Sequence, residues 1–307
     1  MKKAVVTGGA GFIGSHLVEK LAEGGYEVII LDDLSTGKLA NISPLLKDNG
    51  VNFQEGSVTD PPLLQKLFHE ADYVFHLAAV TSVPGSIAMP QATHEVNATG
   101  TLSVLLAARD NGVRKVVYAS SAAVYGDTPV LPQKEDMLPN PQSPYAAAKL
   151  GGEYYCRVFS QLYSLPTVCL RYFNVYGPRQ DPASQYAAAI PRFISVIAAG
   201  GNPVIYGEGN QTRDFIFVKD VARANLMAAE SEAGGVYNIA GGHSISINEL
   251  AQLIIRLMGA KARPTYEEPR EGDILHSLAD ITGAGGFGYQ AEYTLEEGLQ
   301  QTIKYQE

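Results

Sequence analysis

Tyr145 and Lys149 are two residues whose types and spacing suit proton-transfer chemistry. On a helix, side chains four positions apart share a face, so the phenol and the ammonium would point into one cleft. A free phenol titrates near ~10, and a neighbouring cation lowers that pKa, so Tyr145 could act as a base at neutral pH. The pair could also be a half-buried tyrosine beside a surface lysine. Ser120 and Ser121 favour the first interpretation, because they end a predicted strand, where parallel sheets bind their ligands.

A second pattern is the glycine-rich segment from Thr7 to Gly14, which lies between a predicted strand and a predicted helix. Glycines let the backbone turn tightly and approach a pyrophosphate, which then lies at the positive end of the helix. Asp32 ends the next strand, 18 residues beyond Gly14. A carboxylate there accepts both adenosine ribose hydroxyls and repels a 2′-phosphate, which favours NAD over NADP. The alternative is an ordinary tight turn with a solvated aspartate.

The elements that must position these residues alternate along the first half of the chain. Short apolar runs, typical of strands covered on both faces, occur at residues 5–6, 28–31, 73–77 and 116–118. Helical patterns occur at residues 12–24, 61–70, 91–112 and 143–165. This alternation predicts an α/β fold with a doubly wound parallel Rossmann sheet.

The second half of the chain has a looser pattern. Helices are predicted at residues 186–199, 220–232, 246–258 and 295–305, and strands at 215–218 and 236–240. We expect a nucleotide-binding domain over residues 1–170, to which segments near 213–240 return. A smaller α/β part over residues 171–307 would bind the substrate.

Composition narrows the classes of function. The chain has 307 residues, 46% of them hydrophobic, and a formal charge of −9, which argues against nucleic-acid binding. Cys156 and Cys169 cannot build a disulfide framework, which indicates a reducing compartment. No apolar run approaches the ~20 residues of a membrane helix, and glycines interrupt the basic N-terminus before a signal sequence develops. We expect a cytoplasmic protein with no metal, because His16 and Glu19 lack a third ligand at suitable spacing.

Together these motifs resemble those of one known family. The sequence is similar to an extended short-chain dehydrogenase/reductase, specifically a nucleotide-sugar 4-epimerase of the UDP-galactose 4-epimerase type. The matching segments span nearly the whole chain: residues 7–14, 32–34, 76–79, Asn97, 120–126, Tyr145 with Lys149, 171–174 and 213–215. The resemblance implies NAD as cofactor, a UDP-sugar as substrate, and a homodimer formed by pairing the helices near residues 91–112 and 143–165.

The resemblance also implies roles for individual residues. Tyr145 would be the catalytic base, Lys149 would tune it and hold the nicotinamide ribose, and Ser121 would bind the 4-oxygen of the sugar. Contacts to NAD are implied for Gly8, Gly11, Phe12, Ile13, Gly14, Asp32, Ser57, Val58, Leu77, Ala78, Ala79, Asn97, Tyr145, Lys149 and Tyr172. Two positions depart from the family: Ser57 replaces an aspartate that usually contacts adenine, and Asp33 replaces a common asparagine.

On the substrate side, the resemblance implies contacts from Ser121, Tyr145 and residues of the second half. Asn174 and Arg213 would bind the diphosphate, Val204 and Tyr206 would flank uracil, and Arg270 and Asp273 would make late phosphate and ribose contacts. Ser277 falls where the family gates the sugar pocket. A bulky tyrosine there is associated with rejecting N-acetylated sugars, so serine implies that UDP-N-acetylglucosamine is accepted. The alternative is that Ser277 lines a solvated loop.

Ala122 and Ala123 limit the reaction type. Related nucleotide-sugar dehydratases have an Asp–Glu pair just after the catalytic serine or threonine, and UDP-glucuronate decarboxylases have a glutamate there. Alanine can neither donate nor accept a proton, so both activities are disfavoured and 4-epimerisation remains. Two alternatives stay open: a UDP-glucuronate 4-epimerase with Arg179 near the carboxylate, and a non-catalytic NAD-binding sensor or scaffold. Relatives of the latter kind typically lose the tyrosine or the lysine.

Overall fold

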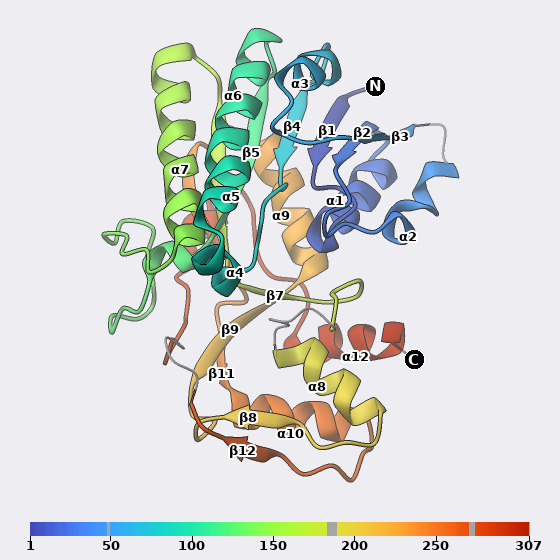
Figure 1. Cartoon of the computed structure of the whole chain (residues 1–307), viewed down its shortest axis with the longest axis vertical. Coiled ribbons are helices and arrows are strands. Elements are labelled where there is room, and N and C mark those ends of the chain that lie inside the picture. The colour runs from blue at the N-terminus through green and yellow to red at the C-terminus, as the bar shows by residue number, and fades with distance from the viewer. Residues whose placement is uncertain (48–49, 183–188, 270–273, 307) are drawn as a thin grey trace.

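The computed structural model of the chain describes residues 1–47, 50–182, 189–269 and 274–306 (Figure 1). In this part of the chain a central sheet has seven strands in the order β10-β6-β5-β4-β1-β2-β3. All neighbouring strands run parallel. The strands are β1 (Lys3–Thr7), β2 (Glu27–Asp32), β3 (Val51–Glu55), β4 (Tyr73–His76), β5 (Lys115–Ser121), β6 (Thr167–Tyr172) and β10 (Gly235–Ile239). The predicted doubly wound α/β fold is confirmed.

Helices cover both faces of this sheet (Figure 1). One face is covered by α1 (Phe12–Glu23) and α9 (Val218–Glu230), whose apolar residues share a core with the sheet. The other face is covered by α3 (Pro61–Leu67), α6 (Gly100–Asp110) and α7 (Pro144–Tyr163). Both sides of the sheet are therefore apolar, which explains the continuous apolar runs of its strands.

The helix predicted at residues 91–112 is interrupted. It consists of α5 (Pro90–His94), a π-helical turn (Glu95–Thr99) and α6. The π turn contains the buried Asn97, whose amide binds both backbone groups of Val80 at 2.8 and 2.9 Å. Insertion of a residue into a helix is common where a side chain must be aimed at a particular group.

A smaller lobe lies beyond the carboxyl ends of the strands (Figure 1). Its core is formed by α8 (Ala189–Ala198), α10 (Ile247–Leu257) and α12 (Leu295–Gln306), next to the strand pair β8 (Val204–Tyr206) and β12 (Thr265–Glu267). A three-stranded sheet of β7 (Asn174–Tyr176), β9 (Thr212–Phe217) and β11 (Ser244–Ser246) connects the lobe to the main sheet. Segments near residues 213–240 were expected to return to the main sheet. The strand β10 does so, whereas β9, which contains most of the strand predicted at residues 215–218, belongs to the three-stranded sheet. The domain division itself stays a prediction.

The remaining described elements are three short α-helices, α2 (Leu39–Ile42), α4 (Val83–Ala88) and α11 (Thr282–Gly285), and two 3-10 turns at Leu45–Lys47 and Ala122–Tyr125. Over the described residues, no helix is both long and apolar enough to cross a membrane. The same residues contain no group of three or more His, Cys, Asp or Glu side chains arranged to hold a metal ion.

Candidate active site

The glycine-rich turn lies where the strand order reverses, between β1 and β4. Gly8 has φ = +72°, and a Cβ added there would lie 2.6 Å from the backbone nitrogen of Ala78, after β4. Any side chain at this position would therefore clash. Gly11 is the N-cap of α1, and no side chain caps that end. The turn therefore presents backbone without side chains at the positive end of α1, which fits a pyrophosphate.

Asp32 is held rigidly at the end of β2. Its carboxylate accepts hydrogen bonds from the amides of Ala10 and Leu34, both at 2.9 Å. Burial raises the pKa of Asp32, and these amides offset part of the rise. A Cβ on Gly37 would lie 2.6 Å from Oδ1, so only glycine lets the backbone pass this close to the carboxylate. Together with the glycine turn, Asp32 fits the adenosine half of NAD.

His76 supports the loop that follows β4 and stays neutral. The hydroxyl of Thr101 donates to the carbonyl of Asn97 at 2.7 Å, so its oxygen is left to accept from Nε2 of His76 at 2.9 Å. Nδ1 of His76 then accepts from Thr7 at 2.8 Å, and Thr7 accepts from the amide of Ala78 at 3.2 Å. Complete burial lowers the pKa of His76 to about 3. His76 therefore positions the loop of residues 77–79 and does not exchange protons.

Three other residues that the resemblance assigns to NAD have side chains engaged within the protein. Asn97 binds Val80, as described above. The hydroxyls of Ser57 and Thr59 are hydrogen-bonded at 2.9 Å. The hydroxyl of Tyr172 donates to Asn225 of α9 at 2.8 Å. Because these side-chain groups are already hydrogen-bonded, contacts with NAD would fall to the backbone of the three residues or to the ring of Tyr172. The roles assigned to them stay predictions.

The structure brings Ser121, Tyr145 and Lys149 together at the carboxyl end of β5. The α7 helix begins at Pro144, and the preceding Ser143 caps it by accepting from the amide of Ala146 at 3.1 Å. Tyr145 lies in the first turn, where the Ser121 hydroxyl is near enough to the phenol to lower its pKa. Lys149 lies one turn further, with Nζ 5.9 Å from the centre of the Tyr145 ring.

The electrostatics of this pair differ from the expectation that Lys149 lowers the pKa of Tyr145. The ammonium of Lys149 donates to the carbonyl of Ala119 at 2.8 Å, and burial lowers the pKa of Lys149 to about 8. Burial raises the pKa of Tyr145, and the nearby Ser121 hydroxyl offsets part of that rise. Desolvation is therefore the main influence on the pKa of Tyr145 in the chain alone.

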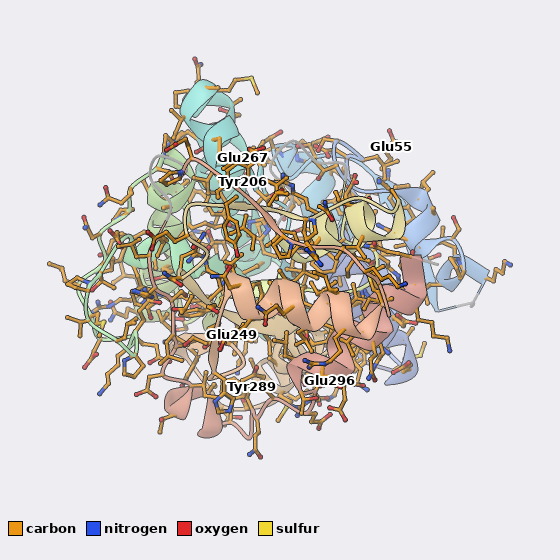
Figure 2. All side chains as sticks on the ribbon, turned by 90° about the horizontal axis from the view of Figure 1, so that it is seen from below. Glu55, Tyr206, Glu249, Glu267, Tyr289 and Glu296 are labelled. Carbon is orange, nitrogen blue, oxygen red and sulfur yellow. The ribbon has the colours of Figure 1, made fainter. Side chains whose placement is uncertain are left out.

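The residues assigned to the substrate lie on β7, β8 and β9. Asn174 donates to the carbonyl of Asp214 at 3.0 Å, and Arg213 donates to the carbonyl of Thr212 at 2.9 Å. Tyr206 contacts Arg192, whose guanidinium lies 5.5 Å from the ring centre. Figure 2 shows Tyr206 beside Glu267, the residue of β12 with which it is paired. Val204 begins the same strand. Arg270 and Asp273 lie outside the described residues.

Ser277 lies beside the strand that carries Arg213. Its side chain is 7% exposed, and its amide donates to the carbonyl of Thr212 at 3.1 Å. This burial does not fit the alternative of a solvated loop. The segment is anchored through Asp214, which accepts from the amides of Ala279 at 3.1 Å and Gly241 at 2.9 Å. This anchor could not be predicted from the sequence, because the segments meet only in the folded chain.

The comparisons with known proteins agree with this geometry. The model of the NAD dependent epimerase/dehydratase family matches residues 4–240. A putative UDP-glucose 4-epimerase of Methanocaldococcus jannaschii is 41% identical over 303 residues, which are 98% of this chain and 97% of the relative. The solved structure of the UDP-N-acetylglucosamine 4-epimerase of Methanobrevibacter ruminantium, in complex with UDP-N-acetylmuramic acid, has a TM-score of 0.96 and 45% identity, and covers 99% of this chain and 97% of that one.

A third comparison concerns the cofactor. The crystal structure of the UDP-glucose 4-epimerase of Thermus thermophilus in complex with NAD has a TM-score of 0.90 and 36% identity, and covers 99% of this chain and 98% of that one. The glycine turn and Asp32 of this chain are built for the same cofactor. The chain belongs to the NAD-dependent epimerase/dehydratase family, as a nucleotide-sugar 4-epimerase of the extended short-chain dehydrogenase/reductase type that uses NAD.

Proposed function

We propose that the protein interconverts UDP-glucose and UDP-galactose by inverting C4, and that it also accepts UDP-N-acetylglucosamine and UDP-N-acetylgalactosamine. The observation that carries this proposal is the grouping of Ser121, Tyr145 and Lys149 with alanines at positions 122 and 123. This set supplies one acid–base group and no second one. It therefore suits a reaction that moves a proton and a hydride at a single carbon.

In the proposed mechanism, Ser121 holds the 4-oxygen of the sugar by a hydrogen bond, and Tyr145 removes the proton from the 4-hydroxyl. When bound, NAD+ supplies a reversible acceptor for the C4 hydride, and its positive charge favours the phenolate of Tyr145. The sugar becomes a 4-ketose and turns over in the cleft. Tyr145 then returns its proton to the 4-oxygen as the hydride is delivered to the opposite face of C4. Lys149 binds the nicotinamide ribose throughout.

Two observations bear on the breadth of substrates. Ser277 is small and buried next to β9, so the pocket has no bulky side chain at this position to exclude an acetamido group. Arg179, the residue considered for binding a glucuronate carboxylate, instead faces α1 and donates to Glu19 at 3.0 Å. This pairing favours neutral hexoses over glucuronate.

We also propose that the protein is a homodimer. Helix α7 exposes a row of large apolar side chains: Tyr154, Tyr155, Val158, Leu162 and Tyr163. A groove of about 640 Å³ lies between α5 and α7 and is lined in part by Pro90, Leu102, Ala147 and Tyr155. Apolar side chains repeating on one helix face are typical of helix–helix association.

A cytoplasmic location also stays a prediction.

The experiment that tests the function uses purified protein with each UDP-sugar and no added cofactor. We expect NMR to detect the C4-inverted sugar, because NAD is regenerated in each turnover and stays bound. Tyr145→Phe should abolish turnover, with its melting temperature and NAD content close to those of the wild type. Stoichiometric release of NADH would identify a dehydrogenase, and near-normal activity of Tyr145→Phe would contradict the mechanism.

A further inference from the structure

A buried ion pair adjoins the catalytic residues and was not anticipated from the sequence. Glu153 of α7 and Arg171 of β6 are 4% and 3% exposed. Arg171 donates from Nε to one carboxylate oxygen at 2.9 Å and from Nη2 to the other at 2.8 Å. The hydroxyl of Ser120 donates to the same carboxylate. The carboxylate is therefore held by three donors from two strands.

The register of the sheet explains how these groups meet. Ser120 and Arg171 are paired residues on the neighbouring strands β5 and β6. Glu153 follows Lys149 by one helical turn and Tyr145 by two, so all three share one face of α7. A single carboxylate on the catalytic face of the helix thus bridges two adjacent strands at their carboxyl ends.

Successive turns of α7 face three neighbouring residues of β5. Tyr145 lies near Ser121, Lys149 donates to the carbonyl of Ala119, and Glu153 accepts from the intervening Ser120. The first and second contacts belong to groups that must also serve the substrate and the cofactor. Of these three side-chain contacts, the Glu153 contact is the one that neither the substrate nor the cofactor uses, and it adds to the hydrogen bond from Tyr118 of β5 to the carbonyl of Lys149.

The arginine also contacts the turn that carries the catalytic serine. Its guanidinium lies 4.7 Å from the centre of the Tyr125 ring. Tyr125 ends the 3-10 turn (Ala122–Tyr125) that Ser121 caps, and its hydroxyl donates to Asn238 at 2.7 Å. Arg171 therefore contacts both the helix that carries Tyr145 and the turn that follows Ser121.

The chemistry of the pair argues for a positioning role. The guanidinium binds both carboxylate oxygens and Ser120 donates to one of them, so the buried carboxylate of Glu153 is engaged in contacts within the protein and does not face the sugar as a proton carrier would. A buried ion pair also contributes little net stability, because desolvation of both charges opposes their attraction. A bidentate pair does restrict geometry, since both of its hydrogen bonds require one orientation of the guanidinium.

We propose that Glu153, clamped by Arg171 and Ser120, is a positioning residue that sets α7 on β5 so that the hydroxyl of Tyr145 meets that of Ser121. This inference rests on the proposed epimerase function. If this role is correct, Glu153, Arg171 and Ser120 affect the rate of the chemical step and not the binding of the UDP-sugar or of NAD.

Two variants separate this role from a merely structural one. Ser120→Ala removes the bond from β5 and leaves the ion pair intact. The double variant Glu153→Met with Arg171→Met removes the clamp and leaves apolar side chains of similar length, a replacement that often preserves stability. Glu153→Gln with Arg171→Gln restores a hydrogen-bonded link without charge. Lys115→Met is the control, because Lys115 is a buried cation at the other end of β5.

The measurements are kcat and KM for UDP-glucose, the pH dependence of kcat, NAD content and melting temperature. We expect kcat to fall about tenfold or more in the double Met variant and several-fold in Ser120→Ala, because small displacements of reacting groups are costly. KM and NAD content should stay within about threefold, the double Gln variant should recover part of kcat, and folded Lys115→Met should keep its kcat.

Full kcat in either folded Ser120→Ala or the folded double Met variant overturns the proposal. A shifted pH dependence of kcat with an unchanged maximal kcat also overturns it, because the Glu153–Arg171 pair would then act through its charge and not by positioning. A rise in KM or a loss of NAD without a fall in kcat would assign it to binding. Wild-type protein that inverts no UDP-sugar refutes the proposed function itself, whereas an active wild type with a fully active double Met variant refutes only the positioning role.

Discussion

Asp214 is a carboxylate buried at 0% exposure, and its side chain accepts from backbone amides, including those of Ala279 and Gly241. Burial raises the pKa of Asp214 from 3.8 to about 7, with the amides offsetting part of the rise. The perturbation is Asp214→Asn, which keeps the shape of the side chain and removes its titration. One carboxylate oxygen becomes an NH2 group that faces a backbone amide, so the variant loses a hydrogen bond at every pH.

The sign and size of the pH effect follow from the raised pKa. Below about pH 4 both the folded and the unfolded protein hold the proton on Asp214. Between pH 4 and 7 the unfolded chain releases it while the folded protein keeps it, so the free energy of unfolding falls as pH rises, and above pH 7 the contribution is lost. From pH 5 to pH 7 the wild type should lose about 3 kcal/mol through this group, since each pH unit is worth about 1.4 kcal/mol.

The assay is urea unfolding of wild type and Asp214→Asn at several values between pH 5 and 8, with saturating NAD. We expect the variant to be destabilised at pH 5 by its lost hydrogen bond, and the difference to shift in its favour by about 3 kcal/mol by pH 8. Asp280→Asn is the control: hydrogen bonds from Thr282 lower the pKa of Asp280, so this carboxyl is ionised in both the folded and the unfolded protein from pH 5 to 8, and its variant should differ from wild type by an amount independent of pH. A difference between Asp214→Asn and wild type that is independent of pH would refute the reasoning.

Three further predictions concern specificity, assembly and stability. Ser277→Tyr should block turnover of UDP-N-acetylglucosamine at least tenfold more than that of UDP-glucose; equal loss of both would remove Ser277 from the sugar pocket. Leu162→Glu, on the exposed apolar row of α7, should convert a dimer to a monomer in light scattering, whereas an unchanged mass would place the interface elsewhere. Lys115→Met should cost about 3 kcal/mol in urea unfolding, because Nζ binds three backbone carbonyls around the C-terminal end of α9.

Local signals were sufficient for most of the central fold. The prediction of a helix at residues 143–165 differs little from α7, because Ser143 and Pro144 specify its start within the sequence itself. The π turn near Asn97 could not be predicted, because it is specified by Val80, which follows a different strand. The strand β6 was not predicted either, and the predicted domain division after residue 170 falls within it.

At the candidate site, the residue types were readable from the sequence but their environment was not. The spacing of Tyr145 and Lys149 places both on one face of α7, yet the pKa of each depends on burial, which the spacing does not contain. The Glu153–Arg171 pair depends on the register of β5 and β6. Glu153 does continue the four-residue spacing of Tyr145 and Lys149, and that repeat was the one signal that could have identified it.

The raised pKa of Tyr145 has a consequence for how the two transfers are ordered. In the chain alone, burial raises this pKa, and the nearby Ser121 hydroxyl offsets part of the rise. Positive charge brought next to the ring would lower the pKa again and favour the base, and removal of that charge would reverse the effect. In the proposed reaction, the oxidised form of NAD would supply this charge. Removal of the proton from the 4-hydroxyl would thus be favoured while a hydride acceptor is present, and return of the proton would be favoured once that acceptor has been used. A tyrosine whose pKa follows the charge beside it therefore suits a reaction that must run in both directions better than a permanently ionised one would.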